Sequence, residues 1–252
     1  IQELNLKKGS LIVEVGSNDG YLSEQFQKKG LKTIGVDPSP YMADLAKQRN
    51  VDTIVDLFDE KTGKIILEKY GKACLVAANN VYNHSNNPLG FTKAVADILS
   101  PDGFFVFEQP YWSTTIKSGK FDQIYNEHVS YYTVKSAKEL LARAGMKIRS
   151  AKIINYHGES LRIVAQLSSH LEEESEEVFA KIKASENLDD LKKLKIKIRS
   201  ETKVDSDDDD DDSDDKDSED DDDDDEDEDE SEDDDDDSNV KVDSSTKVGI
   251  KL

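Results

Sequence analysis

Short runs of branched apolar residues alternate with amphipathic stretches over the first 167 residues of the chain. Continuous apolar runs of four to eight residues are typical of strands that are buried on both faces of a parallel sheet. On this pattern we predict five buried parallel strands, which are Leu11–Val15, Thr33–Val36, Ala73–Ala77, Phe104–Glu108 and Leu161–Gln166.

Four of the stretches between these runs repeat apolar residues three or four positions apart, which is the spacing of one helix face. The predicted helices are Tyr21–Lys29, Pro40–Arg49, Phe91–Leu99 and Ser136–Ala144. Gly145 follows the last of them, where a glycine commonly ends a helix. Alternating strands and helices predict an α/β fold with a doubly wound Rossmann-like sheet, whose ligands bind at the carboxyl ends of the strands.

The pattern changes after Ser168 and divides the chain into four parts. Residues 1–167 are the predicted folded domain, and residues 168–204 are a charged extension with apolar residues at helical spacing. Residues 205–238 are an acidic low-complexity run that we expect to be disordered, because it offers almost nothing apolar to bury and its like charges repel. Residues 239–252 form a short segment that is too small to fold alone.

The acidic run dominates the charge of the chain, which is −23 at pH 7. It holds 28 of the 56 acidic residues, and without it the chain has 32 basic and 28 acidic residues. The folded part is therefore close to neutral. We expect no direct nucleic-acid binding, because the run would repel phosphate.

Cys74 is the single cysteine, so the sequence offers no disulfide framework and no cysteine-based zinc site. No apolar run is long enough to span a membrane, and no signal peptide is visible. We expect a protein of the cytoplasm that binds no metal ion and no membrane.

A glycine-bearing turn follows the first predicted strand and leads into a helix. Gly16 and Gly20 allow the backbone to turn tightly and to approach a ligand closely. The carboxylate of Glu14, at the end of the strand, could pair with an ammonium group. The two glycines do not have the spacing of the dinucleotide pattern, which argues against a nicotinamide-dependent oxidoreductase.

Asp37 follows the second predicted strand, 21 residues after Gly16. A carboxylate in this place can accept hydrogen bonds from both hydroxyls of a ribose. The alternative is that Asp37 caps the helix that begins near Tyr41, with help from Pro38 and Ser39. The glycine turn at the right distance favours ribose binding, so that the pair indicates a ligand that contains adenosine.

Two histidines lie in polar surroundings near the ligand edge of the sheet. His84 follows the strand Ala73–Ala77, and His128 lies in a loop with Tyr125, Glu127 and other hydrogen-bonding residues. Histidine is the natural proton acceptor near neutral pH. The alternative is that these polar groups only tie a long loop to the body of the domain.

Several blocks of the sequence together resemble one family, the C-methyltransferases of deoxysugar biosynthesis, which methylate a nucleotide-linked keto-sugar at carbon. The resemblance runs from about Leu11 to Gln166. The more specific blocks are Tyr-Asn-Glu-His-Val-Ser-Tyr-Tyr at 125–132 and His-Gly-Glu-Ser-Leu-Arg at 157–162, and the more general ones lie at 13–20, 35–39, 78–84 and 107–111.

This resemblance implies a methyltransferase domain at 1–167 that uses S-adenosyl-L-methionine as its cofactor and a nucleotide-linked keto-sugar as its substrate. His128 resembles the general base that removes the proton beside the ketone, and Tyr125, Glu127 and His84 would position the sugar and stabilise the enolate. The implied cofactor-binding residues are Glu14, Gly16, Asn18, Gly20, Asp37 and Asn80.

The sequence departs from the family pattern in three ways. It shows neither the N-terminal cysteine-rich zinc module nor the second nucleotide-fold-like domain that members usually carry, and Glu159 replaces a common glycine. A non-catalytic binding module with a truncated methyltransferase fold is therefore the main alternative to an enzyme.

Overall fold

A computed structural model describes residues 4–156 and 158–170, together with Glu176, Val178 and Ala180. Its contacts separate residues 1–204 from residues 205–252. The predicted acidic run and the final segment lie outside the described residues, as does most of the predicted helical extension. Within that extension Glu176, Val178 and Ala180 are helical, and Val178 is buried in the larger of two cores.

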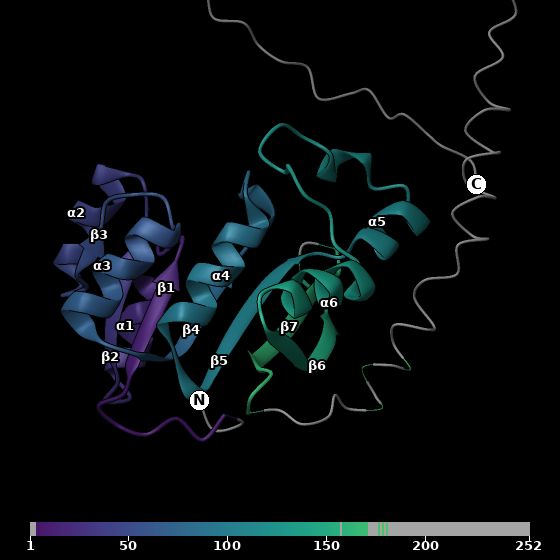
Figure 1. Ribbon diagram of the computed structural model, residues 1–252. Helices are drawn as coiled ribbons and strands as arrows, with labels where there is room; N and C mark the ends of the chain where they lie inside the picture. The colour runs from purple at the N-terminus through teal and green to yellow at the C-terminus, as the bar shows by residue number, and fades with distance from the viewer. Residues whose placement is uncertain (1–3, 157, 171–175, 177, 179, 181–252) are drawn as a thin grey trace, which may run out of the picture. The chain divides into compact units, whose positions relative to one another are not determined.

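Seven strands and six α-helices make up the described part of the chain (Figure 1). The strands are β1 (Leu11–Val15), β2 (Lys32–Val36), β3 (Thr53–Ile54), β4 (Ala73–Asn79), β5 (Leu99–Pro110), β6 (Met146–Ile154) and β7 (Ser160–Leu167). The α-helices are α1 (Tyr21–Gln27), α2 (Pro40–Gln48), α3 (Glu60–Tyr70), α4 (Pro88–Ile98), α5 (Trp112–Lys117) and α6 (Val134–Arg143), and the short 3₁₀ helices are η1 (Tyr82–His84) and η2 (Phe121–Gln123).

The strands form one sheet in the order β3-β2-β1-β4-β5-β7-β6. The first five strands are parallel, and the order reverses at β1, as in a doubly wound fold. β7 runs antiparallel to both β5 and β6. The prediction of a parallel strand at Leu161–Gln166 is therefore wrong, because the short connection between β6 and β7 allows a hairpin but no crossover.

Side chains alternate between two cores on opposite faces of the sheet. In β1, Val13 and Val15 join the larger core with residues of α3, α4 and α6, whereas Ile12 joins the smaller core. Phe26 of α1 packs against that smaller core. Helices therefore cover both faces, as the alternation of strands and helices predicts.

Sequence patterns missed four elements: β3, β6, α3 and α5. β3 has two half-buried residues, too few for a periodic signal. β6 lies at the edge of the sheet and mixes buried with exposed positions, unlike the continuous runs of the inner strands. α4 ends at Ile98 and β5 starts at Leu99, so the Ser-Pro-Asp-Gly segment at 100–103 lies within the strand.

Local signals explain where the other helices begin. Ser39 caps α2 by accepting a hydrogen bond from the Met42 N–H, and Pro40 occupies the first turn. Asn87 caps α4 in the same way before Pro88. Gly145, with φ +72°, follows the end of α6.

Candidate active site

The turn between β1 and α1 needs glycine for two different reasons. Gly16 has φ +68°, and a Cβ there would lie 3.0 Å from the side chain of Val81, which follows β4. Gly20 has φ +76°, and a Cβ there would lie 3.0 Å from the Cβ of Ala46 in α2. The lack of a side chain at Gly16 therefore lets Val81 lie close to the turn, and the lack of one at Gly20 lets α2 approach the start of α1.

Asp37 connects the turn after β1 to the turn after β2. Its Oδ2 accepts a hydrogen bond of 2.9 Å from the Asn18 N–H, and its Oδ1 accepts one of 3.0 Å from the Ser39 N–H. Asn18 has φ +50°, a left-handed conformation that asparagine tolerates. Because Ser39 is the N-cap of α2, Asp37 does not cap that helix. A carboxylate oxygen accepts more than one hydrogen bond, so both oxygens of Asp37 can also accept from a ribose.

Glu14 is a buried carboxylate on the α1 side of β1. Its Oε2 accepts a short hydrogen bond of 2.5 Å from the hydroxyl of Ser23. The pKa of Glu14 is raised from 4.5 to about 7, mainly by burial; hydrogen bonds with Ser23 lower it, and the charges of Asp19 and Asp37 contribute to the rise. A carboxyl group of this kind is costly to ionise, which marks it as a candidate for a functional role.

A pocket of about 560 Å³ lies at the carboxyl ends of β1, β2 and β4. Gly16 is the predicted cofactor residue that lines it, and Val15, Pro38 and Val81 line it as the direct neighbours of Glu14, Asp37 and Asn80. Asn80 follows β4 with φ +52°, and its N–H donates to the carbonyl of Glu108 at 2.7 Å. The predicted cofactor residues therefore shape the ends of the strands, while their neighbours form much of the wall.

Sequence reasoning missed the other side of this pocket. Asp56, Leu57 and Phe58 line it after β3, and Leu57 exposes 68% of its surface. Ser85, Asn86 and Asn87 line it before α4. Strand β3 gives no periodic signal, so the residues that follow it could not be recognised as part of a ligand edge.

His84 joins this pocket to a second group of side chains. It lines the pocket, and its ring centroid lies 5.2 Å from that of His128. Desolvation lowers the pKa of His84, and so does the charge of His128, whereas the charge of Glu127 raises it. His84 is therefore neutral near pH 7, and the predicted catalytic residues His84, Glu127 and His128 act on one another.

His128 is buried, with 8% of its surface exposed, and hydrogen bonds hold both ring nitrogens. Nδ1 lies 2.8 Å from the carbonyl oxygen of Gln123, and Nε2 lies 2.7 Å from the hydroxyl of Tyr125. A carbonyl oxygen only accepts, so Nδ1 carries the proton in the neutral ring. Nε2 then accepts from Tyr125, whose side chain is 45% exposed.

Backbone contacts hold the loop that carries His128. The Ser130 N–H donates to the carbonyl of Asn83 at 3.0 Å, the Trp112 N–H donates to the carbonyl of Tyr132, and Tyr132 stacks on Tyr82 at 5.3 Å. Glu127 is exposed, and no hydrogen bond between it and His128 is found within the described residues. Backbone hydrogen bonds and the stacking of Tyr132 on Tyr82 therefore attach the loop to the domain, while His128 bonds to groups of the loop itself.

Several buried polar atoms have no hydrogen-bond partner among the described residues. They include Asn83 Oδ1, His84 Nε2 and both amide atoms of Gln109. Gln109 is fully buried near the carboxyl end of β5. Burying such atoms without a partner costs about 1–3 kcal/mol each, which indicates that water or a ligand satisfies them. Sequence patterns gave no signal for Gln109.

Glu159, which replaces a common glycine of the resembled family, has φ +84°. This left-handed conformation favours glycine and strains other residues. Its Oε2 accepts a hydrogen bond of 2.8 Å from the hydroxyl of Thr114, which connects the turn before β7 to α5. The substitution therefore keeps the backbone of the turn and adds a side-chain contact.

Two further properties bear on the predicted partners. No helix within residues 4–156 and 158–170 is both long and apolar enough to cross a membrane. The same part of the chain brings together no group of three or more histidine, cysteine, aspartate or glutamate side chains that could hold a metal ion.

Comparisons with known proteins identify the family. A sequence profile described as a methyltransferase domain matches residues 1–151. The C-methyltransferase NovU of Streptomyces niveus is 33% identical over 165 residues, which cover 66% of this chain and 39% of that protein. The ubiquinone biosynthesis O-methyltransferase of Shewanella halifaxensis is 28% identical over 101 residues, which cover 39% of this chain and 43% of that protein. The chain thus spans less than half the length of these relatives.

Solved structures share the fold. A chain from a complex of the Haloferax volcanii Trm112 methyltransferase activator with a methyltransferase has a TM-score of 0.52 and 15% identity, over 64% of this chain and 84% of that one. Magnesium protoporphyrin IX methyltransferase from Synechocystis, solved with bound SAH, has a TM-score of 0.50 and 15% identity, over 64% of this chain and 75% of that one. The profile match shows that the chain belongs to the methyltransferase domain family, and the solved structures show that it shares their Rossmann-like fold.

Proposed function

We propose that the chain is a C-methyltransferase that methylates the carbon beside the ketone of a nucleotide-linked keto-sugar, through an enolate. The observation that carries the proposal is the pairing of His128 Nε2 with the Tyr125 hydroxyl, next to His84 at the edge of the cofactor pocket. Methylation at carbon requires a base, because the carbon must first lose a proton. The identity to a C-methyltransferase supports the same reaction.

The pocket beside Gly16 fits the cofactor. Gly16 lines the pocket at the end of β1, and the carboxylates of Asp37 and Glu14 suit ribose hydroxyls and an ammonium group. Asn18, Gly20 and Asn80 shape the backbone on which these groups stand. When it is bound, S-adenosyl-L-methionine supplies a methyl group on a sulfonium, which is already activated for attack by a carbanion.

Tyr125 and His128 can move the substrate proton together. The C–H bond beside the ketone breaks, its proton passes to the phenolic oxygen of Tyr125, and the phenolic proton passes to His128 Nε2. The electron pair of the C–H bond stays on the sugar as the enolate. The Gln123 carbonyl stabilises the resulting imidazolium through Nδ1–H. His128 is buried, whereas Tyr125 is 45% exposed, so Tyr125 is the member of the pair that a substrate can reach.

Neutral donors beside the base suit the enolate oxygen. His84 is neutral near pH 7, so its ring can donate a hydrogen bond without carrying a charge. The amide nitrogen of Gln109 is a further buried donor without a partner among the described residues. Preorganised donors aimed at a developing oxyanion are worth several kcal/mol in a site that excludes water. Glu127, which is exposed, would instead bind a sugar hydroxyl.

The test is a turnover assay of the 252-residue chain with a nucleotide-linked 4-keto-6-deoxysugar. We expect the methyl group from S-adenosyl-L-methionine to appear on the carbon beside the ketone. With SAH in its place and D₂O as solvent, the proton on that carbon should exchange. Methylation at an oxygen would overturn the proposal, and binding of the sugar without exchange or transfer would point instead to a non-catalytic binding module.

A further inference from the structure

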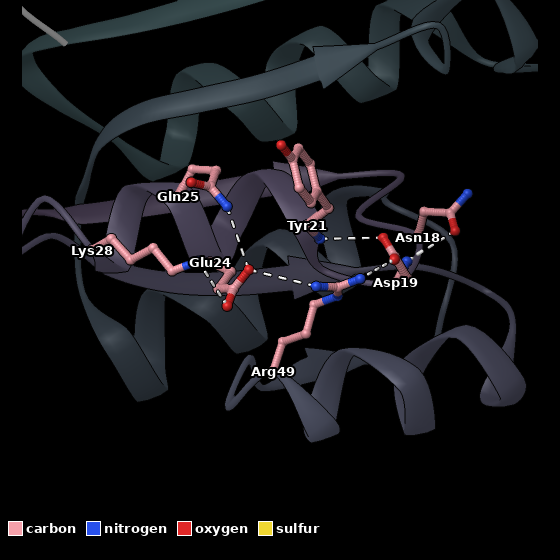
Figure 2. Close-up of polar contacts among 7 residues, drawn as sticks. All are labelled: Asn18, Asp19, Tyr21, Glu24, Gln25, Lys28 and Arg49. Carbon is pink, nitrogen blue, oxygen red and sulfur yellow. Dashed lines mark hydrogen bonds and ion pairs between the residues drawn. The ribbon is translucent and has the colours of Figure 1, made fainter.

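A network of charged and polar side chains surrounds the N-terminus of α1, on the outer side of the glycine turn (Figure 2). Its members are Asn18, Asp19, Tyr21, Glu24, Gln25, Lys28 and Arg49. Six of them belong to the turn or to α1 and its C-terminal cap. Arg49 belongs to the end of α2, so its ion pairs connect this network to that helix.

Arg49 contacts two carboxylates at once. Its Nη2 lies 2.9 Å from Oδ2 of Asp19, and its Nη1 lies 3.5 Å from Oε2 of Glu24. The guanidinium also lies 5.8 Å from the ring centroid of Tyr21, within range of a cation–π contact. Figure 2 shows the guanidinium between the two acidic side chains. A planar fork with several donors can hold both, which a lysine cannot do.

Asp19 connects Arg49 to the turn between β1 and α1. Its Oδ1 accepts from the Tyr21 N–H at 3.2 Å, and its own N–H donates to Oδ1 of Asn18 at 2.8 Å. Asn18 in turn donates its N–H to Asp37. Arg49, Asp19, Asn18 and Asp37 therefore form a continuous chain of contacts from the end of α2 to the end of β2, and this chain passes through the turn.

Backbone hydrogen bonds fix the inner part of the turn, since the Gly16 and Ser17 N–H groups donate to the carbonyl of Val36 at 2.8 and 3.2 Å, and the Gly20 N–H donates to that of Ser17 at 2.9 Å. Gly20 has no side chain, and a Cβ there would meet Ala46, one turn before Arg49 on α2. No side chain caps α1 through a hydrogen bond at Gly20. The contact with Ala46 and the ion pairs of Arg49 therefore connect the turn to α2.

We infer that Arg49 is a positioning residue for cofactor binding, which holds the turn from Gly16 to Gly20 in its binding conformation through Asp19 and Glu24. The inference rests on the proposed placement of the cofactor at Gly16. A turn that is already ordered loses less conformational freedom when the ligand binds. The affinity for the cofactor therefore depends on the clamp, which is the pair of ion pairs from Arg49 to Asp19 and Glu24, even though Arg49 does not touch the ligand.

The size of the effect follows from exposure. The side chains of Arg49 and Asp19 are 37% and 35% exposed, so water and salt screen their attraction. We expect Arg49→Gln to raise the Kd for SAH about three- to tenfold, and Arg49→Lys, which can keep one of the two pairs, to give an intermediate value. High salt should reduce the difference in the Kd for SAH between the wild type and the Arg49 variants.

Calorimetry with SAH on the full chain tests the clamp through a double-mutant cycle. Arg49→Gln and Asp19→Asn should each weaken binding, and the double variant should be no weaker than the weaker single variant, because both remove the same contact. Lys28→Gln is the matched control. It removes the other ion pair of Glu24, which is 3.0 Å long, and should leave the Kd unchanged.

Three results would overturn the clamp. A Kd within twofold of wild type in both Arg49 variants, with a lower melting temperature, would mean that the residue only stabilises the fold. Additive effects of Arg49→Gln and Asp19→Asn would mean that the two act separately. Absence of SAH binding in the wild type would remove the cofactor placement itself. The experiment uses no sugar, so methylation at an unexpected atom would leave the clamp standing.

Discussion

The ligand edge of the sheet has two halves, one at the ends of β1 and β2 and one at the ends of β4 and β5, and their polar groups are bonded differently. At the ends of β1 and β2, most polar groups of the turns bond to one another, as Asn18 with Asp37 and Asp19 with Arg49 do. At the ends of β4 and β5, Asn83, His84 and Gln109 bury polar atoms that have no partner within the described residues. In the first half the buried hydroxyls of Ser17 and Thr53 also lack a partner among those residues, but Asp19, Asp37 and Arg49 are all bonded, so the second half offers more hydrogen bonds that another molecule can take.

The proposed function gives the two halves different tasks. A cofactor that every turnover uses in the same way is best bound by a fixed turn, which loses little freedom on binding. A reacting sugar gains more from donors and acceptors that become satisfied only when it is present, because such contacts can strengthen towards the transition state. The predictions below test whether the two halves can be separated by mutation.

The largest expected effect is on the base. His128→Ala should lower exchange of the sugar proton at least roughly a hundredfold, because general-base catalysis typically contributes a hundred- to ten-thousandfold. Methyl transfer should fall with it. The Kd for SAH should change less than twofold, since the cofactor half does not include His128. Deuterium exchange followed by NMR and calorimetry would measure the two effects.

Glu127→Gln is the companion variant and should mainly raise the KM for the sugar, because Glu127 is exposed and does not bond to the base. If His128→Ala exchanges the proton at nearly the wild-type rate, His84 is the better candidate for the base and our assignment is wrong.

Glu14 should make stability depend on pH. Its pKa rises from 4.5 to about 7 on folding. The folded protein therefore holds this proton more tightly than the unfolded chain, and the stability contributed by protonated Glu14 is fully present below pH 4.5 and is lost as the pH rises through about 7. By linkage, the loss is roughly 3 kcal/mol.

Glu14→Gln should abolish this loss, so that the variant is more stable than wild type at pH 8 and similar at pH 4.5. Urea unfolding at both pH values would measure this. The same variant should bind SAH more weakly if the carboxylate pairs with the ammonium group. Unchanged affinity would show that Glu14 has no part in cofactor binding.

Gln109 and Gln166 offer a matched pair of fully buried glutamines. Gln166 accepts from Arg149 and donates to the carbonyl of Asp102, whereas neither amide atom of Gln109 has a partner in the part of the chain that the structure describes. Gln109→Met should therefore raise the free energy of unfolding by about 1–2 kcal/mol, and Gln166→Met should lower it by a similar amount.

Chemical denaturation of both variants would test this contrast. Gln109→Met should also raise the KM for the sugar and leave the Kd for SAH unchanged. If it instead destabilises the fold as much as Gln166→Met does, the second half of the edge is not organised around unsatisfied groups, and the contrast between the halves disappears.

The smallest expected effect comes from the acidic run. Truncation after Val204 should change the free energy of unfolding by less than about 0.5 kcal/mol, because residues 205–238 have almost no apolar surface to bury. A large drop in melting temperature would show that the run contributes to the fold. The Kd for SAH of the truncated chain should equal that of the full chain.

The amino-acid sequence by itself determined the cofactor half in outline. Buried strands reveal themselves as apolar runs, and Gly16 and Asp37 stand at fixed places after such runs, so their meeting at one edge follows from the parallel arrangement. The resemblance added His128 and Tyr125, which the structure brings within 2.7 Å of each other. These features depend on residues that are close in sequence or on strands that neighbour one another.

Only the tertiary structure decided the rest. β7 is antiparallel because β6, an edge strand without a continuous apolar run, precedes it. Asp19 and Arg49 are 30 residues apart and meet because Gly20 lets α2 approach α1. Gln109 and Gln166 are the same type of residue and are both fully buried, but the segments around Gln109 leave its amide without a partner among the described residues. A sequence pattern records which residues are apolar and how they are spaced, but whether a polar group finds a partner depends on which distant segments pack beside it.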